Sequence, residues 1–384
     1  MPGLADVVRQ HGPGYQARFG ESLLPSHARA LRDIVQCRTQ AMGGHLVECT
    51  SCAARHLVYH SCRNRACTRC GAERAAHWVE RQRDLLLPVT YFHVVFTLPA
   101  ELRELVRRHQ KRLIPVLFRA AFQSLSELCA DPRHLGGAIG ALAVLHTWTR
   151  ALQWHPHVHL LVPGGALKDD GTWLPARRTR SGQPYLVPVH ALSVKFWGRF
   201  LALARRAVPD APFPDLPKRK RWVVHAKPAL QGSERVLEYL GRYIHRTAIS
   251  DSAILASDPE RVTFRYRDST DGRTKAMTLS AAEFLRRFLQ HVPPRGVHRV
   301  RAFGLLHPSQ RTTLRRLQLL LGHHERVHVE AAPPHPTTPP RCNHCGGATS
   351  TRGPRLSPKQ CLAILPKLEL STSARAPPRA EHRP

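Results

Sequence analysis

Apolar and polar positions follow two different periods along the chain, and the period distinguishes strands from helices. Alternating runs rich in β-branched and aromatic residues predict strands, whereas apolar positions recurring every three or four residues predict helices. The predicted strands are residues 91–98, 141–149, 158–162, 261–266 and 275–279. The predicted helices are residues 73–87, 101–129 with a break near Pro115, and 232–246. Residues 1–36 are also expected to be helical, although their apolar positions are spaced irregularly. Strands 141–149 and 158–162 are expected to be antiparallel neighbours, and Asp271-Gly272 predicts a hairpin turn.

This pattern, read with local composition, divides the chain into four regions. Residues 1–36 are a helical segment, and the cysteine-rich residues 37–88 form a small domain of their own. Residues 89–330 mix helices and strands and form the main domain. Residues 331–384 are rich in Pro, Thr, Ser and Arg, so we expect a disordered tail.

The charge of the chain indicates a polyanionic partner. It has 58 Lys+Arg against 27 Asp+Glu, which gives a net charge of +31. A surplus of this size usually marks nucleic-acid binding, although a generally arginine-rich composition would also produce it. We find no secretory signal, no apolar run of about 18 residues and no P-loop, so we expect a cytoplasmic protein with no membrane contact that does not depend on ATP.

The cysteines favour zinc rather than disulfides. Three C-x-x-C pairs occur where chance gives about 0.3. Cys49/Cys52 and Cys67/Cys70 have nearly the separation of a four-cysteine zinc site, and they predict a structural zinc ribbon with no open coordination position.

The cysteine-rich domain has further ligand types and cations. Cys37, His45 and Cys62 are the candidates for a second zinc site. The third C-x-x-C pair, Cys342/Cys345, lies in the tail, where a zinc half-site, a weak zinc site and an empty turn are all open. Three arginines in the cysteine-rich domain are expected to contact DNA phosphates without reading sequence, namely Arg63, Arg65 and Arg69.

A histidine pair lies in the predicted strand 158–162 and the residues before it. His157 and His159 are two positions apart, so their side chains share one face of a strand and can act as two cis ligands of a metal ion. His146 on the neighbouring strand is the candidate third ligand, and His93 is a weaker one. The alternative is an ordinary polar strand face in a chain with 25 histidines.

A tyrosine pair lies on the predicted helix 232–246. Tyr239 and Tyr243 are four residues apart, so both hydroxyls emerge from one helix face. A core aromatic stripe would give the same spacing, but Arg242 and Arg246 beside them favour a phosphate-facing surface. A tyrosine with a pKa near 10 is a poor nucleophile, and cations with a metal ion at the phosphate would compensate. The product would be a phosphotyrosine, and the rejoining of strands would need no external energy.

Taken together, these motifs resemble the two-tyrosine rolling-circle transposases of bacterial insertion sequences, which belong to the HUH endonuclease superfamily. The resemblance extends from about residue 37 to 306 and is carried by CRTQAMGGH, SCRNRACTRC, YFHVVFTLP, HTW with WHPHVHLLVPGG, and YLGRYIHR. One departure is Ala66, where similar proteins often have histidine.

The resemblance implies an α+β fold with an HUH-type palm, in which helices flank a central antiparallel sheet, preceded by the zinc ribbon. It implies that His157 and His159 bind Mg²⁺ or Mn²⁺ and that Tyr239 and Tyr243 are the nucleophiles. The implied activity is nicking of single-stranded DNA at element ends, a 5′-phosphotyrosine link, and strand transfer into target DNA.

Three other functions are compatible with parts of the sequence. A plasmid or phage replication-initiator nickase would use the same chemistry, but the N-terminal cysteine module and the absence of a helicase motif favour a transposase. A non-catalytic zinc-dependent DNA-binding protein would leave the His and Tyr pairs as coincidences. A carboxylate-dependent two-metal transposase is disfavoured because the chain is poor in acids and Asp169-Asp170 precedes Gly171 in a turn pattern.

Overall fold

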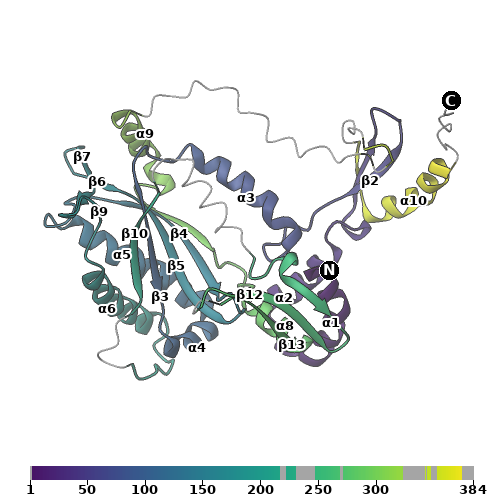
Figure 1. Ribbon diagram of the computed structural model, residues 1–384, viewed down its shortest axis with the longest axis horizontal. Coiled ribbons are helices and arrows are strands. Elements are labelled where there is room, and N and C mark those ends of the chain that lie inside the picture. The colour runs from purple at the N-terminus through teal and green to yellow at the C-terminus, as the bar shows by residue number, and fades with distance from the viewer. Residues whose placement is uncertain are drawn as a thin grey trace.

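The protein is an α+β molecule, as the sequence predicted, with antiparallel sheets and helices in both of its larger lobes (Figure 1). The computed structural model describes residues 2–216, 222–230, 247–268, 271–322, 342, 344–346 and 353–373. One lobe contains a five-stranded sheet, a second contains the N-terminal helices, and helix α3 (Thr68–Arg83) runs between them.

The five-stranded sheet is antiparallel throughout and has the order β10-β3-β5-β4-β14. Its strands are β3 (Tyr91–Thr97), β4 (Gly140–Trp148), β5 (Trp154–Pro163), β10 (Val224–Leu230) and β14 (Val300–Gly304). The predicted strands 91–98, 141–149 and 158–162 are thereby confirmed, and the last two are neighbours as expected. Strand β5 lies at the centre, so both of its edges are paired.

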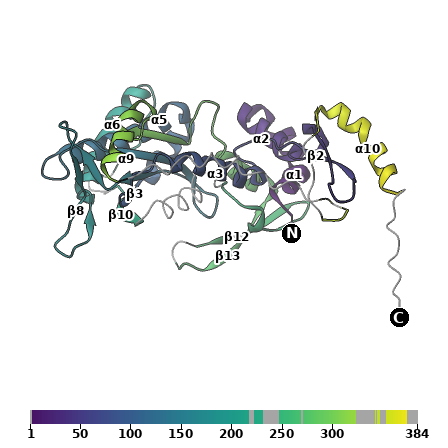
Figure 2. The same ribbon diagram turned by 90° about the horizontal axis from the view of Figure 1, so that it is seen from above.

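Helices cover one face of this sheet and bury its main core (Figure 2). The covering helices are α4 (Ala100–Arg108), α5 (Gln110–Ala130) and α6 (Val189–Ala207). Alternate residues of the strands, such as Phe96 and Val158, point into this core with aromatic residues of the helices. Among the described residues, α5 is long and apolar enough to cross a membrane, but it packs on the sheet and on α6 as a core helix.

The opposite sheet face carries the predicted histidines and a smaller apolar cluster. That cluster includes Tyr91, Leu142 and Leu161 with Trp78 of α3 packed against it. Helix α9 (Arg311–Leu320) lies beyond, and a cavity of about 220 Å³ separates it from α3 and the sheet. Helix α3 therefore covers one end of this face, and the histidines lie toward the other end of the same strands.

A second core joins the N-terminal helices to a segment much later in the chain. Helices α1 (Leu4–Phe19) and α2 (Pro25–Gln36) pack with α8 (Ala281–Gln290) and a sheet of β11 (Ile254–Ser257), β12 (Arg261–Arg267) and β13 (Thr274–Ser280). The β12–β13 pairing confirms the predicted hairpin. Residues 1–36 therefore share a core with residues 249–292, which bury their apolar faces.

Asp251 connects the N-termini of α1 and α3 within this second core. Its Oδ1 accepts hydrogen bonds from the backbone N–H of Leu4 at 2.8 Å and from Thr68 Oγ1 at 2.8 Å. One carboxylate therefore neutralises the N-terminus of α1 and holds the first residue of α3.

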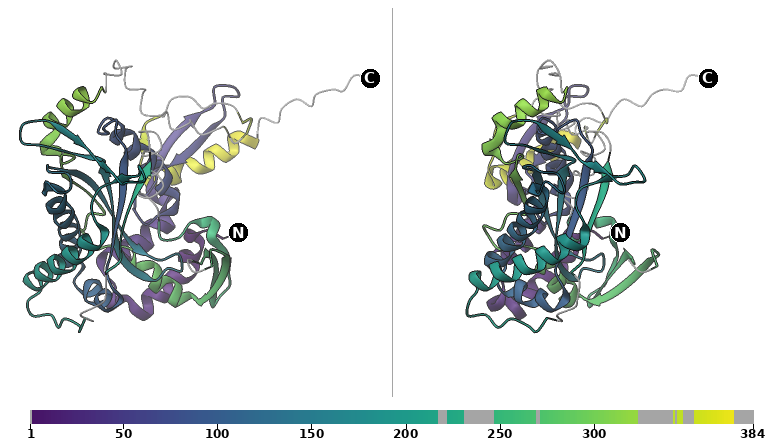
Figure 3. Two further views of the ribbon diagram at one scale, coloured as in Figure 1. Left: turned by 60° about the vertical axis from the view of Figure 1, so that its left-hand side comes forward. Right: turned by 90° about the vertical axis from the view of Figure 1, so that its left-hand side faces the viewer.

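A third, small sheet lies at the far end of the molecule, with helix α10 beside it (Figure 3). Strands β1 (Gly44–Glu48) and β2 (Arg55–Tyr59) form a hairpin, and β15 (Arg355–Leu356) pairs with β1. Helix α10 (Pro358–Ser373) follows. The expectation of a disordered tail is therefore wrong for residues 353–373, because these residues dock onto the N-terminal hairpin.

Short elements complete the described chain: β6 (Gly165–Leu167), β7 (Trp173–Pro175), β8 (Arg177–Arg178), β9 (Pro184–Tyr185), η1 (Gly20–Ser22), η2 (Gln40–Met42), η3 (Asp251–Ala253) and η4 (Pro308–Gln310). The predicted helix break near Pro115 falls instead at His109, between α4 and α5. Pro115 lies within α5, where it removes only one backbone hydrogen bond. The predicted helix 73–87 begins earlier and ends at Arg83, while the predicted helix 232–246 lies outside the described residues.

Candidate active site and metal clusters

Strand register brings three histidines together on the face of the sheet opposite α5 and α6. His146 of β4 is the direct partner of His157 on β5, and His159 follows on the same face. One ligand nitrogen from each ring can be chosen so that all three lie within 4.8 Å of one another. The burial pattern of β5 alternates as predicted, because Val158 and Leu160 are fully buried on the other face while His157 and His159 are half-buried.

Hydrogen bonds to the Nδ1 atoms orient two of these rings. His157 Nδ1 donates to the carbonyl oxygen of His155 at 2.7 Å, which leaves the lone pair on Nε2. His159 Nδ1 shares a hydrogen bond of 2.7 Å with His93 Nε2, and the two rings stack with centroids 5.0 Å apart. Metal-binding histidines are usually held in this way through the nitrogen that does not face the ion. His93 is therefore in a position to orient the ring of His159.

A β-bulge shapes the end of β5 where the histidines lie. The register between β4 and β5 shifts after the His146–His157 pair, so that two residues of β5 oppose one of β4. Pro156 is one of the two, and the bulge tolerates it because a residue in this position need not donate to the ladder. The bulge also brings the His155 carbonyl oxygen within reach of the His157 ring.

Burial keeps the imidazoles in their neutral form. Desolvation, with smaller effects from His157 and His225, lowers the pKa of His93 to about 4. Burial and the neighbouring histidines also lower the pKa of His159, and burial lowers the pKa of His157. Neutral rings at pH 7 offer lone pairs rather than protons, which suits a cation.

Ring contacts of Trp148 connect His146 with Arg299, and a charge of the cysteine-rich module acts on Arg299. The Trp148 ring stacks on His146 with centroids 4.9 Å apart, and the Arg299 guanidinium lies 4.9 Å from the centre of the Trp148 ring. Burial, followed by the charge of Arg65, lowers the pKa of Arg299 to about 10. Arg65 lies on the loop between Cys62 and Cys67, so its positive charge acts on Arg299 from a different part of the chain.

The tyrosines predicted as nucleophiles lie outside the described residues, as do the arginines beside them. These residues are Tyr239, Tyr243, Arg242 and Arg246. The described chain leaves the sheet at Leu230, the last residue of β10, and resumes at Thr247 near the second core. On β10 itself, His225 and Lys227 pair with Val95 and His93 of β3.

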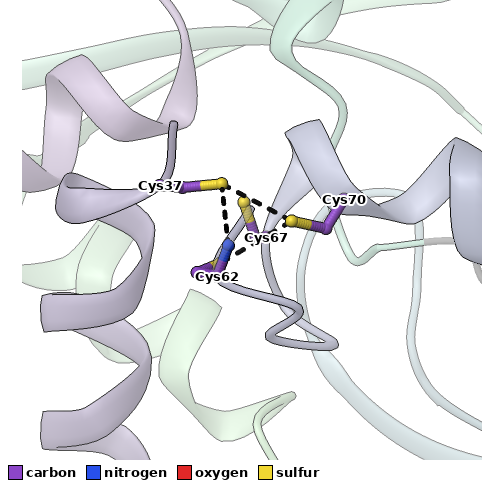
Figure 4. Close-up of side chains that lie close together, drawn as sticks. All are labelled: Cys37, Cys62, Cys67 and Cys70. Carbon is purple, nitrogen blue, oxygen red and sulfur yellow. Dashed lines mark hydrogen bonds between the residues drawn. The ribbon is translucent and has the colours of Figure 1, made fainter. Parts of the chain in front are cut away.

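A first cysteine cluster closes where three segments meet (Figure 4). Cys37 is the C-cap of α2, and Cys62 lies in the loop between β2 and α3. Cys67 is the N-cap of α3, and Cys70 is in its first turn. The four sulfurs lie within 4.8 Å of one another, with 3.5 Å between Cys37 and Cys70. Four sulfurs around a zinc ion at about 2.3 Å would be roughly 3.8 Å apart, so the spacing fits a closed tetrahedral zinc site.

A second cluster contains the other two C-x-x-C pairs. Cys49 and Cys52 lie at the tip of the β1–β2 hairpin, and Cys342 and Cys345 come from the tail. The Sγ atoms are 3.5 Å apart between Cys49 and Cys345, and 3.7 Å apart between Cys52 and Cys342.

The structure therefore corrects the expected zinc ribbon. Cys49/Cys52 and Cys67/Cys70 do not share a site, because the first pair lies at the tip of a hairpin and the second beyond its base. Strands of five residues separate tip and base by roughly 16 Å. Each pair instead finds its partners elsewhere in the chain.

His45 is also not a member of either cluster. Its Nδ1 donates to the carbonyl oxygen of Gly353 at 3.0 Å, and its ring lies edge-on to His60. Cys37 and Cys62, which were the other candidates for a second zinc site, complete the cluster of Cys67 and Cys70. Similar proteins often have histidine at position 66. Alanine there is consistent with this cluster, because its four thiols already make a complete ligand set for zinc.

The arginines of the module have two different positions. Arg63 and Arg65 are exposed on the loop between Cys62 and Cys67. Arg69 is exposed as well, but its guanidinium donates to the carbonyl oxygen of Cys37 at 3.3 Å. It therefore also supports the C-terminus of α2 at the first cluster.

Sequence reasoning underrated two features of these sites. It treated His93 as a weak candidate because nothing local shows that β3 and β5 are neighbours. The sequence also leaves open whether Cys342/Cys345 is a half-site, a weak zinc site or an empty turn, although a C-x-x-C pair without a nearby partner is a signal that its partner lies far along the chain.

Comparisons with known proteins match both halves of the chain. A transposase zinc-binding domain model matches residues 7–98, and a putative transposase family model matches residues 140–313. A putative transposase, y4qJ, of Sinorhizobium fredii is 41% identical, with 79% of this chain and 80% of the relative covered. The transposase for insertion sequence element IS801 of Pseudomonas savastanoi pv. phaseolicola is 28% identical, with the same coverage. No solved structure was found to match.

Proposed function

Because the chain belongs to the IS91-type transposases with an N-terminal zinc-binding domain, we propose that it cuts and rejoins single-stranded DNA through tyrosine nucleophiles. As a transposase it is a DNA-processing enzyme, and this membership favours transposition over a replication-initiator nickase or a non-catalytic regulator. The proposal concerns the mechanism, in which Tyr239 and Tyr243 attack DNA phosphates and His146, His157 and His159 hold a divalent ion.

The observation that carries the proposal is the convergence of three histidine side chains on one sheet face. The donor set fits a divalent cation, since two of the rings are already oriented through Nδ1 and are neutral at pH 7. Imidazole ligands suit Mn²⁺ better than Mg²⁺, although three protein ligands leave positions for water and phosphate with either ion. When bound, the ion would polarise the scissile phosphate and neutralise its developing charge.

The chemical step is a transesterification. The phenol oxygen of one tyrosine attacks the phosphorus, the bond from phosphorus to the 3′ oxygen breaks, and the phenol proton leaves while the 3′ oxygen gains one. A 5′-phosphotyrosine and a free 3′-OH result. Attack by a 3′-OH on the phosphotyrosine then reverses the exchange and frees the tyrosine. One phosphodiester replaces another, and two tyrosines allow the two successive transfers of a rolling-circle pathway.

Positive charge near the histidines supports a phosphate backbone as the substrate. Arg299 is buried against Trp148, and Arg65 is close enough to affect its pKa. With Arg63 exposed on the same loop as Arg65, the first cysteine cluster would hold a cationic loop near the strand to be cut. The role of zinc there is structural, because four thiolates leave no open position.

The test is the formation of a covalent protein–DNA adduct. Labelled single-stranded DNA from the ends of the encoding element is incubated with Mn²⁺, with Mg²⁺ or with a chelator, and adducts that survive SDS are counted. We expect adducts with either ion and none with the chelator, and loss of all adduct in the Tyr239→Phe/Tyr243→Phe variant. Tyr266→Phe, on β12, is the matched control and should form adduct normally. A wild-type protein that forms none under any condition, or an adduct that survives the double substitution, overturns the proposal.

A further inference from the structure

We infer that the cluster formed by the hairpin tip and the tail is a second zinc site, which fastens the C-terminal segment of the chain to the N-terminal hairpin. Its ligands are Cys49 and Cys52 after β1, and Cys342 and Cys345 almost three hundred positions later. The matched zinc-binding domain ends at residue 98, so the two tail cysteines lie outside it.

The distances between sulfurs exclude disulfides and fit a tetrahedral ion. Cys49 and Cys345 are 3.5 Å apart, and Cys52 and Cys342 are 3.7 Å apart. A disulfide requires about 2.05 Å, whereas four thiolates at about 2.3 Å from a zinc ion are roughly 3.8 Å from each other. The two measured separations are close to the second value, and all four sulfurs face a common centre because they lie within 4.8 Å of one another.

The two halves of the cluster have the same backbone design. In the hairpin half, the N–H of Ser51 lies 3.4 Å from Cys49 Sγ, and the N–H of Ala53 donates to the Cys49 carbonyl oxygen at 3.0 Å. In the tail half, the N–H of His344 lies 3.4 Å from Cys342 Sγ, and the N–H of Gly346 donates to the Cys342 carbonyl oxygen at 2.9 Å.

Both turns also end in the left-handed region. Ala53 has a φ of 53° and Gly346 a φ of 71°, each four residues after the first cysteine of its pair. Alanine is rarely found at positive φ, so a strained turn is maintained at Ala53. Each turn directs N–H groups toward a sulfur, which stabilises the thiolate form that zinc requires. The two turns have the same backbone geometry and face each other. This indicates a single metal site to which each turn contributes two cysteines.

Docking of the tail is supported by contacts that involve no cysteine. β15 pairs with β1, the N–H of Gly353 donates to the Leu46 carbonyl oxygen at 2.9 Å, and the Gly353 carbonyl oxygen accepts from His45. A Cβ at Gly353 would lie 2.7 Å from the Leu46 oxygen, and one at Gly43 would lie 2.5 Å from the Leu356 oxygen. Two glycines thus permit the close approach of hairpin and tail.

The surroundings explain why an ion is needed. Most side chains of β1 and β2 are only half-buried, and β15 contributes only two residues to the sheet. So small a sheet buries too little apolar surface to hold a distant segment by itself. A tetrathiolate zinc site supplies that energy in the way that small metal-bound modules do.

Zinc content of the purified full-length protein tests the inference. Metal analysis should find two zinc ions per chain in the wild type and one in the Cys342→Ser/Cys345→Ser variant. The retained ion reports that the first cluster, and therefore the N-terminal module, is still folded. Cys361→Ser is the matched control, since Cys361 is buried in α10 of the same segment but is not part of the cluster, and it should retain two ions. A wild type with one zinc, two zinc ions in the double variant, or iron in place of zinc would each refute the second site.

A cleavage experiment measures the fastening itself. A protease site placed within residues 331–341 allows the full-length protein to be cut after it has folded. The C-terminal fragment should co-elute with the rest of the protein on gel filtration, and it should separate after chelation or in the Cys342→Ser/Cys345→Ser variant. A fragment that separates at once while both zinc ions are bound would show that the ion does not join the two segments.

Discussion

The histidine cluster and the cysteine clusters are built on opposite principles. His146, His157 and His159 are brought together by the hydrogen-bonded ladder of β4 and β5, in a sheet whose other face is buried by α5 and α6. The cysteine clusters instead join segments from different parts of the chain. The first lies at the edge of the second core, whereas the second joins a hairpin and a tail segment whose side chains are mostly only partly buried. We therefore expect the sheet to fold without an ion and to leave coordination positions open for chemistry, whereas four thiols in each cysteine cluster would fill every position of a zinc ion that helps the module to fold.

Removal of zinc is the strongest test of this difference. Structural zinc supplies about 10–16 kcal/mol in small zinc modules at neutral pH. In the Cys67→Ser/Cys70→Ser variant, or after chelation, we expect loss of amide hydrogen-exchange protection in β1, β2 and the start of α3. Amides of β3, β4 and β5 should keep their protection. If the central strands lose protection together with the hairpin, the sheet also depends on zinc and the distinction fails.

Loss of a histidine ligand should lower activity and leave the fold intact, whereas removal of zinc should unfold part of the protein. His157→Ala removes a proposed ligand of the divalent ion, so adduct formation should fall about 10³-fold, or ~4 kcal/mol in the barrier. The melting temperature should change little, because the ring is not part of the apolar core. His190→Ala, an exposed histidine on α6, is the control and should have full activity. Normal adduct formation by His157→Ala would remove the histidine cluster from the mechanism.

His93 gives a smaller and more specific effect. Because it touches His159 Nδ1 and not the proposed ion site, His93→Ala should raise the Mn²⁺ concentration needed for half-maximal adduct formation about 10–100-fold. The maximal yield at saturating Mn²⁺ should be affected less. His93→Gln keeps a hydrogen-bonding group near the same position and should restore part of the affinity. An equal defect at all Mn²⁺ concentrations would indicate a purely structural role.

Asp251 shows how much of the N-terminal module rests on hydrogen bonds rather than on zinc. Asp251→Ala removes the acceptor for Leu4 N and Thr68 Oγ1, which should cost about 1–2 kcal/mol. Exchange of the α1 amides should quicken accordingly while the zinc content stays constant. Ser252→Ala changes the exposed neighbour and should have no such effect. Loss of zinc on Asp251→Ala would mean that this junction, and not the ion, maintains the first cluster.

The sequence by itself determined the elements and the ligand types. The two-residue period fixed which face of β5 carries His157 and His159, because neighbouring side chains on a strand point to opposite faces. The C-x-x-C pairs fixed the chemistry of the cysteine clusters in the same way, since each pair is a local turn. The helices and strands were predicted to within a few residues where their apolar period was strong.

Only the tertiary structure decided which distant groups meet. The pairing of Cys67/Cys70 with Cys37 and Cys62, the return of the tail to Cys49/Cys52, and the contact of His93 with His159 all depend on strand order and on the direction of a hairpin. No local pattern encodes these, because a ligand pair has the same spacing whichever partner it finds. Burial of the N-terminal helices by residues 249–292 also could not be predicted locally. An amphipathic face predicts that some segment will cover it, but it does not predict which segment.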